Sequence, residues 1–180
     1  GLKAHCEEKS MEFMSSPFSN AAVDLLEKIN VKRYKIGSGE VSNFLMLEKI
    51  ARTGKPIILS SGMSSFDELD QTVEFLKEKG NPLSILQCTT SYPTQPDQWG
   101  LNVIPELRKR YRVPVGFSDH SGDIYASLAA AALGAEIFES HVVFDKKMFG
   151  PDSKSSLDLG QTKRLVRGIK AIQESLSNPI

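Results

Sequence analysis

The strongest constraint on the fold is a regular alternation between two kinds of segment. Short runs rich in β-branched and aromatic residues alternate with amphipathic stretches of helical periodicity. Because two parallel strands need a crossover connection, repeated strand–helix–strand steps predict a parallel sheet flanked by helices. The predicted strands lie in MEFMSS, RYKIGSG, PIILSSG, LSILQCTTSY, VPVGFSD and AEIFESHVVF.

The predicted helices have recognisable ends and apolar faces. Ser65 followed by Glu68 forms a capping-box pattern at the start of one helix, and Gly80 suits the position just beyond its end. Apolar residues at helical spacing mark the buried face of each helix. They are Phe66, Leu69, Val73 and Leu76 in this helix, Ala22, Leu25 and Ile29 in the first, and Leu165, Ile169, Ile172 and Leu176 in the last.

Two α/β architectures compete for such a sheet. A doubly wound open sheet normally has a glycine fingerprint after its first strand, which is absent here. A (β/α)8 TIM-type barrel has its functional residues at the carboxyl ends of many strands. Nearly every run here ends in small polar or ionisable residues, which favours the barrel. A whole barrel takes about 250 residues. With 180 residues and six runs, we expect an incomplete barrel of about six β/α units, forming one domain over residues 1–180.

Composition narrows the classes of function. Lys and Arg together number 22 and balance 22 Asp and Glu, so there is no overall basic field to gather nucleic acid or an anionic membrane. The two cysteines, Cys6 and Cys88, are too few for a disulfide framework and fit a reducing compartment. No apolar run approaches the length of a membrane span. We therefore expect a cytoplasmic protein with no nucleic-acid or membrane partner.

Two of the three histidines follow successive predicted strands. His120 and His141 are separated by an Ala-rich helical stretch, so parallel strands would bring both to the same rim of the sheet. Two imidazoles with open coordination positions suit a divalent transition metal acting as a Lewis acid, with Asp119 or Glu139 orienting an imidazole. The alternative is a pair of half-buried histidines that only form hydrogen bonds.

The segment YKIGSGE combines a cation with a tight glycine turn. Lys35 would point inward from its strand, where a lone cation is costly unless an anion meets it. Backbone N–H groups near Gly37 and Gly39 could cradle a phosphate, and Ser60 begins a similar Ser-Gly segment after the next run. These features together indicate a phosphorylated substrate. The alternative is an ordinary strand-terminal turn with Lys35 and Glu40 on the surface.

Seven motifs occur in order between about Phe13 and Leu159: SPFS, YKIGSGE, KPIILSSGM, CTTSYPT, GFSDHS, ALGAEIFESH and GPDSKSSL. Together they resemble the sialic acid synthase family, which includes N-acetylneuraminate synthase and its legionaminic, pseudaminic and spore-coat polysaccharide relatives. The resemblance implies a TIM-type barrel enzyme. It implies condensation of phosphoenolpyruvate with an N-acylated amino-sugar aldehyde, of the N-acetylmannosamine type, to a nine-carbon 2-keto sugar acid and phosphate.

The same resemblance assigns roles to individual residues. His120 and His141 match the ligands of a divalent metal, usually Mn²⁺. Glu40 and Asp152 match carboxylates near the reacting groups and are the candidates for proton handling. The residues that match substrate contacts are Ser16, Lys35, Ser38, Ser60, Thr90, Tyr92 and Ser118.

The chain also departs from the family pattern. Thr90 stands where Asn is frequent, Ser16 where Thr is usual, and Ser140 where a basic residue precedes the second histidine. We expect the family's first two strands and its C-terminal antifreeze-like domain to be missing. An open sheet edge would then favour a homodimer or a strand-completing oligomer. The alternatives are a non-catalytic remnant that binds phosphate ligands or assembles with a partner, and a condensing barrel that makes a shorter keto sugar acid; the GPDSKSSL loop argues against the latter.

Overall fold

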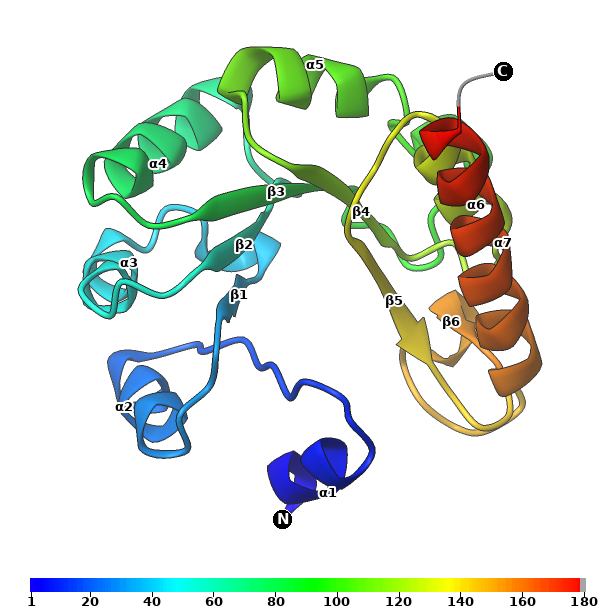
Figure 1. The fold of residues 1–180 in the computed structure, drawn as a ribbon, viewed down its shortest axis with the longest axis horizontal. Coiled ribbons are helices and arrows are strands. Elements are labelled where there is room, and N and C mark those ends of the chain that lie inside the picture. The colour runs from blue at the N-terminus through cyan, green and yellow to red at the C-terminus, as the bar shows by residue number, and fades with distance from the viewer. Residues whose placement is uncertain (179–180) are drawn as a thin grey trace. The chain divides into compact units, whose positions relative to one another are not determined.

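The computed structural model describes residues 1–178, and Pro179 and Ile180 lie outside the described residues. Figure 1 labels its helices and strands in chain order. The described chain divides into two compact units. The first contains Gly1–Ser60 and Ser64–Ser84, and the second contains Ser61–Met63 and the chain from Ile85 onward. The single domain expected over residues 1–180 stays a prediction.

The first unit alternates helices with two short parallel strands. Strand β1 (Tyr34–Ile36) pairs with β2 (Ile57–Ser60), with Lys35 opposite Ile58 in the register. Every residue of both strands is buried, so these strands form the core of the unit. The remaining elements are α1 (Leu2–Glu8), α2 (Asn20–Lys28), the 3₁₀ turn η1 (Ser38–Glu40), α3 (Phe44–Ala51) and α4 (Phe66–Glu78).

The second unit contains four strands that pair in parallel in sequence order. Strand β3 (Leu83–Cys88), whose first two residues belong to the first unit, pairs with β4 (Val115–Asp119). Strand β4 pairs with β5 (Phe138–Val142), and β5 pairs with β6 (Ser156–Leu157). The other elements are η2 (Pro96–Gln98), α5 (Val103–Tyr111), α6 (Tyr125–Ala132), η3 (Ser153–Ser155) and α7 (Leu159–Ser177).

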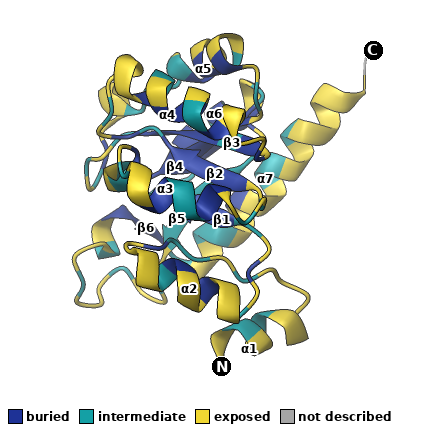
Figure 2. Ribbon diagram, turned by 90° about the vertical axis from the view of Figure 1, so that its left-hand side faces the viewer, coloured by how far each residue is buried: buried dark blue, intermediate teal, exposed yellow. Residues whose placement is uncertain are grey.

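Strands β4 and β5 differ in how far their residues are buried. All five residues of β4 are buried, whereas those of β5 are half-buried and its last residue, Val142, is exposed. Figure 2 shows this difference as a dark blue β4 and a teal β5. Strand β5 therefore presents side chains that solvent and small ligands can reach. No helix among residues 1–178 combines the length and apolar character needed to cross a membrane.

Residues 1–178 contain six strands, the number predicted, but one is in a different place. Residues 11–16, MEFMSS, form no strand, and Met11 and Met14 are exposed. The sixth strand is instead β6, within the segment GPDSKSSL that was expected to be a polar loop. Strand β6 is only two residues long, and its pairing with His141 and Val142 defines it. A period of two residues cannot be recognised over that length.

The helix boundaries were easier to predict than the helix faces. In α4 the Ser65 hydroxyl accepts from the Glu68 N–H while the Glu68 carboxylate accepts from the Ser65 N–H, which confirms the capping box. In α2 the predicted face is wrong, because Val23 and Leu26 are buried while Leu25 is exposed. Both sets satisfy helical spacing, so tertiary packing decides between them.

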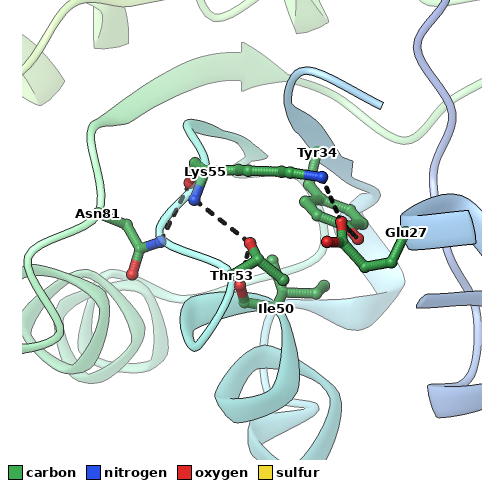
Figure 3. Close-up of polar contacts among 6 residues, drawn as sticks. All are labelled: Glu27, Tyr34, Ile50, Thr53, Lys55 and Asn81. Atoms are coloured by element: carbon green, nitrogen blue, oxygen red, sulfur yellow. Dashed lines mark hydrogen bonds and ion pairs between the residues drawn. The ribbon is translucent and has the colours of Figure 1, made fainter. Parts of the chain in front are cut away.

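Polar side chains fasten the start of β1 to α2 and to the loop before β2 (Figure 3). The buried Tyr34 hydroxyl donates to Glu27 Oε1 at 2.7 Å, and Lys55 Nζ donates to the same oxygen at 2.5 Å. Burial, followed by the bond to Glu27, raises the pKa of Tyr34. Burial alone would raise the pKa of Glu27, but the bonds from Lys55 and Tyr34 and the Lys55 charge outweigh it and lower that pKa. We call these three residues the Glu27 cluster.

The loop before β2 is also held from its other side. Asn81 Nδ2 donates to the carbonyl oxygens of Lys55 at 3.0 Å and Ala51 at 3.2 Å. Thr53 Oγ1 donates to the carbonyl of Ile50 at 2.7 Å and accepts from the Lys55 N–H at 3.3 Å. The turn between α3 and β2 is therefore fixed by Thr53 within it and by Asn81 from beyond α4, and Lys55 in this turn reaches Glu27 (Figure 3).

Candidate functional site

Neighbouring parallel strands bring two histidines together in the second unit. His120 directly follows the last residue of β4, and His141 lies within β5. The parallel register pairs Ser118 with Glu139, so the carboxyl ends of the two strands lie at the same edge of the sheet. The two imidazole rings lie 5.3 Å apart between centroids and are inclined at 51°. The structure therefore places the two predicted ligands side by side.

The surroundings of His120 fix its tautomer. Its Nδ1 lies 3.0 Å from the carbonyl oxygen of Thr89, which can only accept, so Nδ1 carries the proton. Burial lowers the pKa of His120, outweighing the bond to Thr89, and the nearby His141 lowers it further. The ring is thereby kept neutral, with a lone pair on Nε2. An imidazole oriented in this way by a backbone carbonyl is typical of a metal ligand.

Tyr92, in the loop after β3, covers this ring. Its hydroxyl lies 3.3 Å from Nε2 of His120, and the two rings are stacked at 4.3 Å between centroids and 27° between planes. The Tyr92 ring also meets His141 edge-on at 5.8 Å. Burial above all, and then the negative charges around it, raise the pKa of Tyr92, so its phenol remains protonated and donates to Nε2.

Asp152 reaches the pair from the loop that connects β5 to β6. Its Oδ2 lies 3.8 Å from Nδ1 of His141, and both side chains are about half exposed. The carbonyl oxygen of Asp152 accepts from the Ser155 N–H at 3.0 Å and from the Ser156 hydroxyl at 2.7 Å, which anchors the loop end. Asp152 can therefore attract a protonated His141 or take a proton from a group bound beside it.

The same loop borders an open hollow of about 260 Å³. Its lining is largely apolar but includes Asp152 and Ser153, so it lies next to the His141–Asp152 pair. The apolar side chains that line it are Val142, Val143, Phe144, Met148, Phe149 and Pro151.

Other polar residues at these strand ends are engaged within the protein. The Ser118 hydroxyl donates to Glu139 Oε1 at 2.8 Å. The carboxylate of Asp119 accepts from the Ser121 N–H at 2.8 Å and from the Ser127 hydroxyl at 2.7 Å, so it fastens the turn after β4 to α6. The partner that orients His120 is thus the carbonyl of Thr89, which sequence reasoning missed.

The donor set fits a divalent metal ion only in part. Among residues 1–178 no group of three or more His, Cys, Asp or Glu side chains is arranged to hold a metal ion. His120 and His141 would supply two nitrogen ligands, and the other positions would fall to water or substrate. Neutral, oriented imidazole and open positions suit a catalytic metal site more than a closed structural one.

Two predicted phosphate contacts lie in the first unit. Lys35 is buried in β1, and Ser60, which ends β2, stands two residues beyond the partner of Lys35 in the register. The Ser60 hydroxyl is buried and has no hydrogen-bond partner within the described part of the chain. A buried hydroxyl without a partner costs free energy, so the Ser60 hydroxyl is suited to bind a polar group of a ligand.

The remaining predicted residues have plainer surroundings. Ser38 and Glu40 form the short turn η1 after β1, and Glu40 accepts from the Asn43 amide at 2.7 Å. Ser16 is half-buried in a segment without regular structure. Thr90 is exposed in the loop after β3. Their predicted roles in binding and proton handling stay predictions.

Parallel strands alternating with helices, with imidazole, hydroxyl and carboxylate groups at their carboxyl ends, define an α/β protein of the TIM-barrel class. The model of the NeuB family matches residues 1–180, and the chain belongs to this family. The resemblance stated from the motifs and the predicted fold class are thereby confirmed.

Named relatives and a solved structure support this assignment. The chain is 38% identical to human N-acetylneuraminate-9-phosphate synthase over 99% of its own length and 50% of the relative's. It is also 38% identical to N,N'-diacetyllegionaminic acid synthase from Campylobacter jejuni, over 99% and 54% of the two chains. The crystal structure of sialic acid synthetase from Leptospira borgpetersenii matches with a TM-score of 0.95 and 34% identity, over 99% of this chain and 63% of that one. The chain spans about half the length of these curated relatives.

Proposed function

We propose that this chain takes part in a metal-dependent condensation of phosphoenolpyruvate with an N-acylated amino-sugar aldehyde of the N-acetylmannosamine type. The product would be a nine-carbon 2-keto sugar acid, with phosphate released. The observation that carries the proposal is the pair of imidazoles, His120 and His141, that adjacent strands present 5.3 Å apart in a member of the NeuB family. The named synthases among its relatives support the same reaction class.

His120 and His141 are the proposed ligands of a divalent metal, with Mn²⁺ as the first candidate. Such an ion would act as a Lewis acid on the aldehyde oxygen of the amino-sugar. The carbonyl of Thr89 would hold His120 in the tautomer that leaves Nε2 available. His141 is more exposed than His120 and faces Asp152, so it would stand on the solvent side of the site.

The phosphate of phosphoenolpyruvate is the proposed partner of Lys35 and Ser60. A buried ammonium group favours an anion, and the Ser60 hydroxyl is a donor without a partner among residues 1–178. The other proposed substrate contacts are Ser16, Ser38, Thr90, Tyr92 and Ser118.

The reaction also needs groups that handle protons. Attack of carbon 3 of the enol on the aldehyde carbon forms the new bond and leaves an oxygen that takes up a proton. Water then adds to carbon 2 and loses one proton. The hydroxyl left on carbon 2 gives up its proton as the C–O bond breaks, so that the keto group forms and phosphate leaves with the bonding electrons and that proton. Asp152, 3.8 Å from His141, and Glu40, held by Asn43, are the proposed carriers of the proton that the aldehyde oxygen takes up and of the proton that the added water loses. A cytoplasmic location and a homodimer or strand-completing oligomer are further parts of the proposal.

The test is an incubation of the chain with Mn²⁺, phosphoenolpyruvate and N-acetylmannosamine, with released phosphate and the sugar acid measured. We expect phosphate release that requires both the metal and the amino-sugar. Binding of phosphoenolpyruvate without turnover would instead indicate a non-catalytic member of the family. Turnover only with a shorter sugar aldehyde would indicate a synthase of a shorter keto sugar acid.

A further inference from the structure

The hydroxyl of Tyr92 lies at the atom of His120 that a metal ion would need. Because Nδ1 of His120 donates to the carbonyl of Thr89, Nε2 carries the only lone pair of the ring that points outward. The phenol of Tyr92 donates to that lone pair across 3.3 Å. One lone pair cannot accept this hydrogen bond and bind a metal ion at the same time.

We propose that Tyr92 is a positioning residue with two mutually exclusive states. Without metal, its phenol caps Nε2 of His120. When a divalent ion binds to Nε2, the hydroxyl is displaced and becomes available to a ligand beside His141 and Asp152. This inference rests on the metal site of the proposed function, and it adds a coupling between metal binding and a side chain of the substrate pocket.

The surroundings of Tyr92 allow the side chain to move while its loop stays in place. The Thr94 N–H donates to the carbonyl of His120 at 3.1 Å, and the Thr94 hydroxyl donates to the carbonyl of Ser91 at 2.7 Å. These bonds tie the loop to the end of β4. Tyr92 is 48% exposed, and its ring contacts are with the imidazoles of His120 and His141. Rotation of the side chain would give up these two ring contacts and the hydrogen bond to Nε2.

The two states make the metal affinity and the position of Tyr92 reciprocal. Metal binding releases the phenol and so favours any ligand that binds the free phenol. By linkage, that ligand raises the metal affinity by the same factor by which the metal raises the affinity for the ligand. The hydrogen bond to Nε2 must be broken before the metal binds. A net hydrogen bond of ordinary strength corresponds to a roughly twofold to tenfold weaker affinity than the same site would have without the hydroxyl.

The variant Tyr92→Phe tests this directly, because it keeps the ring stacked on His120 and removes only the hydroxyl. Tyr125→Phe is the matched control, since Tyr125 is exposed at the start of α6 and has no ring contact with the histidines. The Mn²⁺ dissociation constant of the wild-type chain and both variants is measured by titration calorimetry. His120→Ala identifies the site at which the ion binds.

We expect Tyr92→Phe to bind Mn²⁺ about twofold to tenfold more tightly than the wild-type chain, and Tyr125→Phe to bind it equally well. Addition of Zn²⁺ should give a near-ultraviolet tyrosine difference spectrum in the wild type that Tyr92→Phe lacks. If Tyr92→Phe binds Mn²⁺ at His120 as well as, or more weakly than, the wild type, the proposed capping of Nε2 by Tyr92 is wrong. The proposed metal site is then still supported. If neither chain binds Mn²⁺ at His120, the cap and the metal part of the proposed function both fail.

Discussion

Two polar clusters of this protein are built in opposite ways. In the Glu27 cluster, the carboxylate receives both the Tyr34 hydroxyl and the Lys55 ammonium group at short distances. At the ends of β4 and β5, the contacts of His120 and His141 are longer and one of the rings is half exposed. The first cluster is closed in the sense that its carboxylate, ammonium and hydroxyl groups pair with one another, although the Glu27 side chain is itself 38% exposed, and it holds the start of β1. The second keeps nitrogen atoms available for a ligand, as parallel α/β proteins do at the carboxyl ends of their strands.

The largest expected effect concerns the open cluster. His120→Ala and His141→Ala should each weaken Mn²⁺ binding at least about 100-fold. Changing a residue that only hydrogen-bonds to a metal ligand already costs about 10-fold to 100-fold in affinity, and losing the ligand itself should cost more. Titration calorimetry measures the affinity. His5→Ala is the matched control, since the His5 side chain is exposed on α1 in the first unit. Unchanged affinity in either site variant would contradict the metal site.

A smaller effect of a different kind is expected in the closed cluster. Glu27→Ala should lower the free energy of unfolding by about 2 kcal/mol, because the buried Tyr34 hydroxyl loses its acceptor. Tyr34→Phe should cost only about 1 kcal/mol, since Glu27 keeps its bond to Lys55. Urea titrations measure both values.

The comparison between the clusters requires that Glu27→Ala leave Mn²⁺ affinity unchanged. If this variant weakened Mn²⁺ binding as strongly as the histidine variants do, the two clusters would not be independent. The Mn²⁺ affinity of Glu27→Ala must be measured under conditions in which the urea titration shows that the variant is fully folded.

The open cluster, His120 and His141, could be predicted from the sequence because its position follows from the direction of the chain in parallel strands. Consecutive parallel strands bring their carboxyl ends to one edge, so His120 and His141 could be placed together before any contact was known. The capping box of α4 was predicted for a similar reason, since Ser65 and Glu68 interact within one turn. In the first case the contact follows from the direction and order of neighbouring strands, and in the second from the geometry of a single helical turn.

Contacts that depend on tertiary packing could not be predicted in the same way. Every residue has a carbonyl oxygen, so nothing in the sequence distinguishes Thr89 as the partner of His120. The stacking of Tyr92 on His120 depends on the course of an irregular loop. The buried face of α2 and the two-residue strand β6 are decided by what packs against them.

The smallest expected effect is the pH dependence of the Glu27 cluster. The pKa of Glu27 is lowered in the folded protein, so this carboxylate contributes stability that is present above its ordinary pKa of 4.5 and is lost as the pH falls through the folded value. Glu27→Gln cannot ionise. The difference in unfolding free energy between the wild type and Glu27→Gln should therefore shrink as the pH falls from 7 to about 3.

The effect is small because burial of Glu27 opposes the bonds from Lys55 and Tyr34. Tyr34→Phe should retain part of the pH dependence, since the Lys55 ammonium group still favours the ionised carboxylate. Urea titrations across this pH range provide the measurement. A difference between wild type and Glu27→Gln that stays constant with pH would show that the ionised form of Glu27 is not what stabilises β1. The closed cluster would then differ from the open one in its packing rather than in its charge.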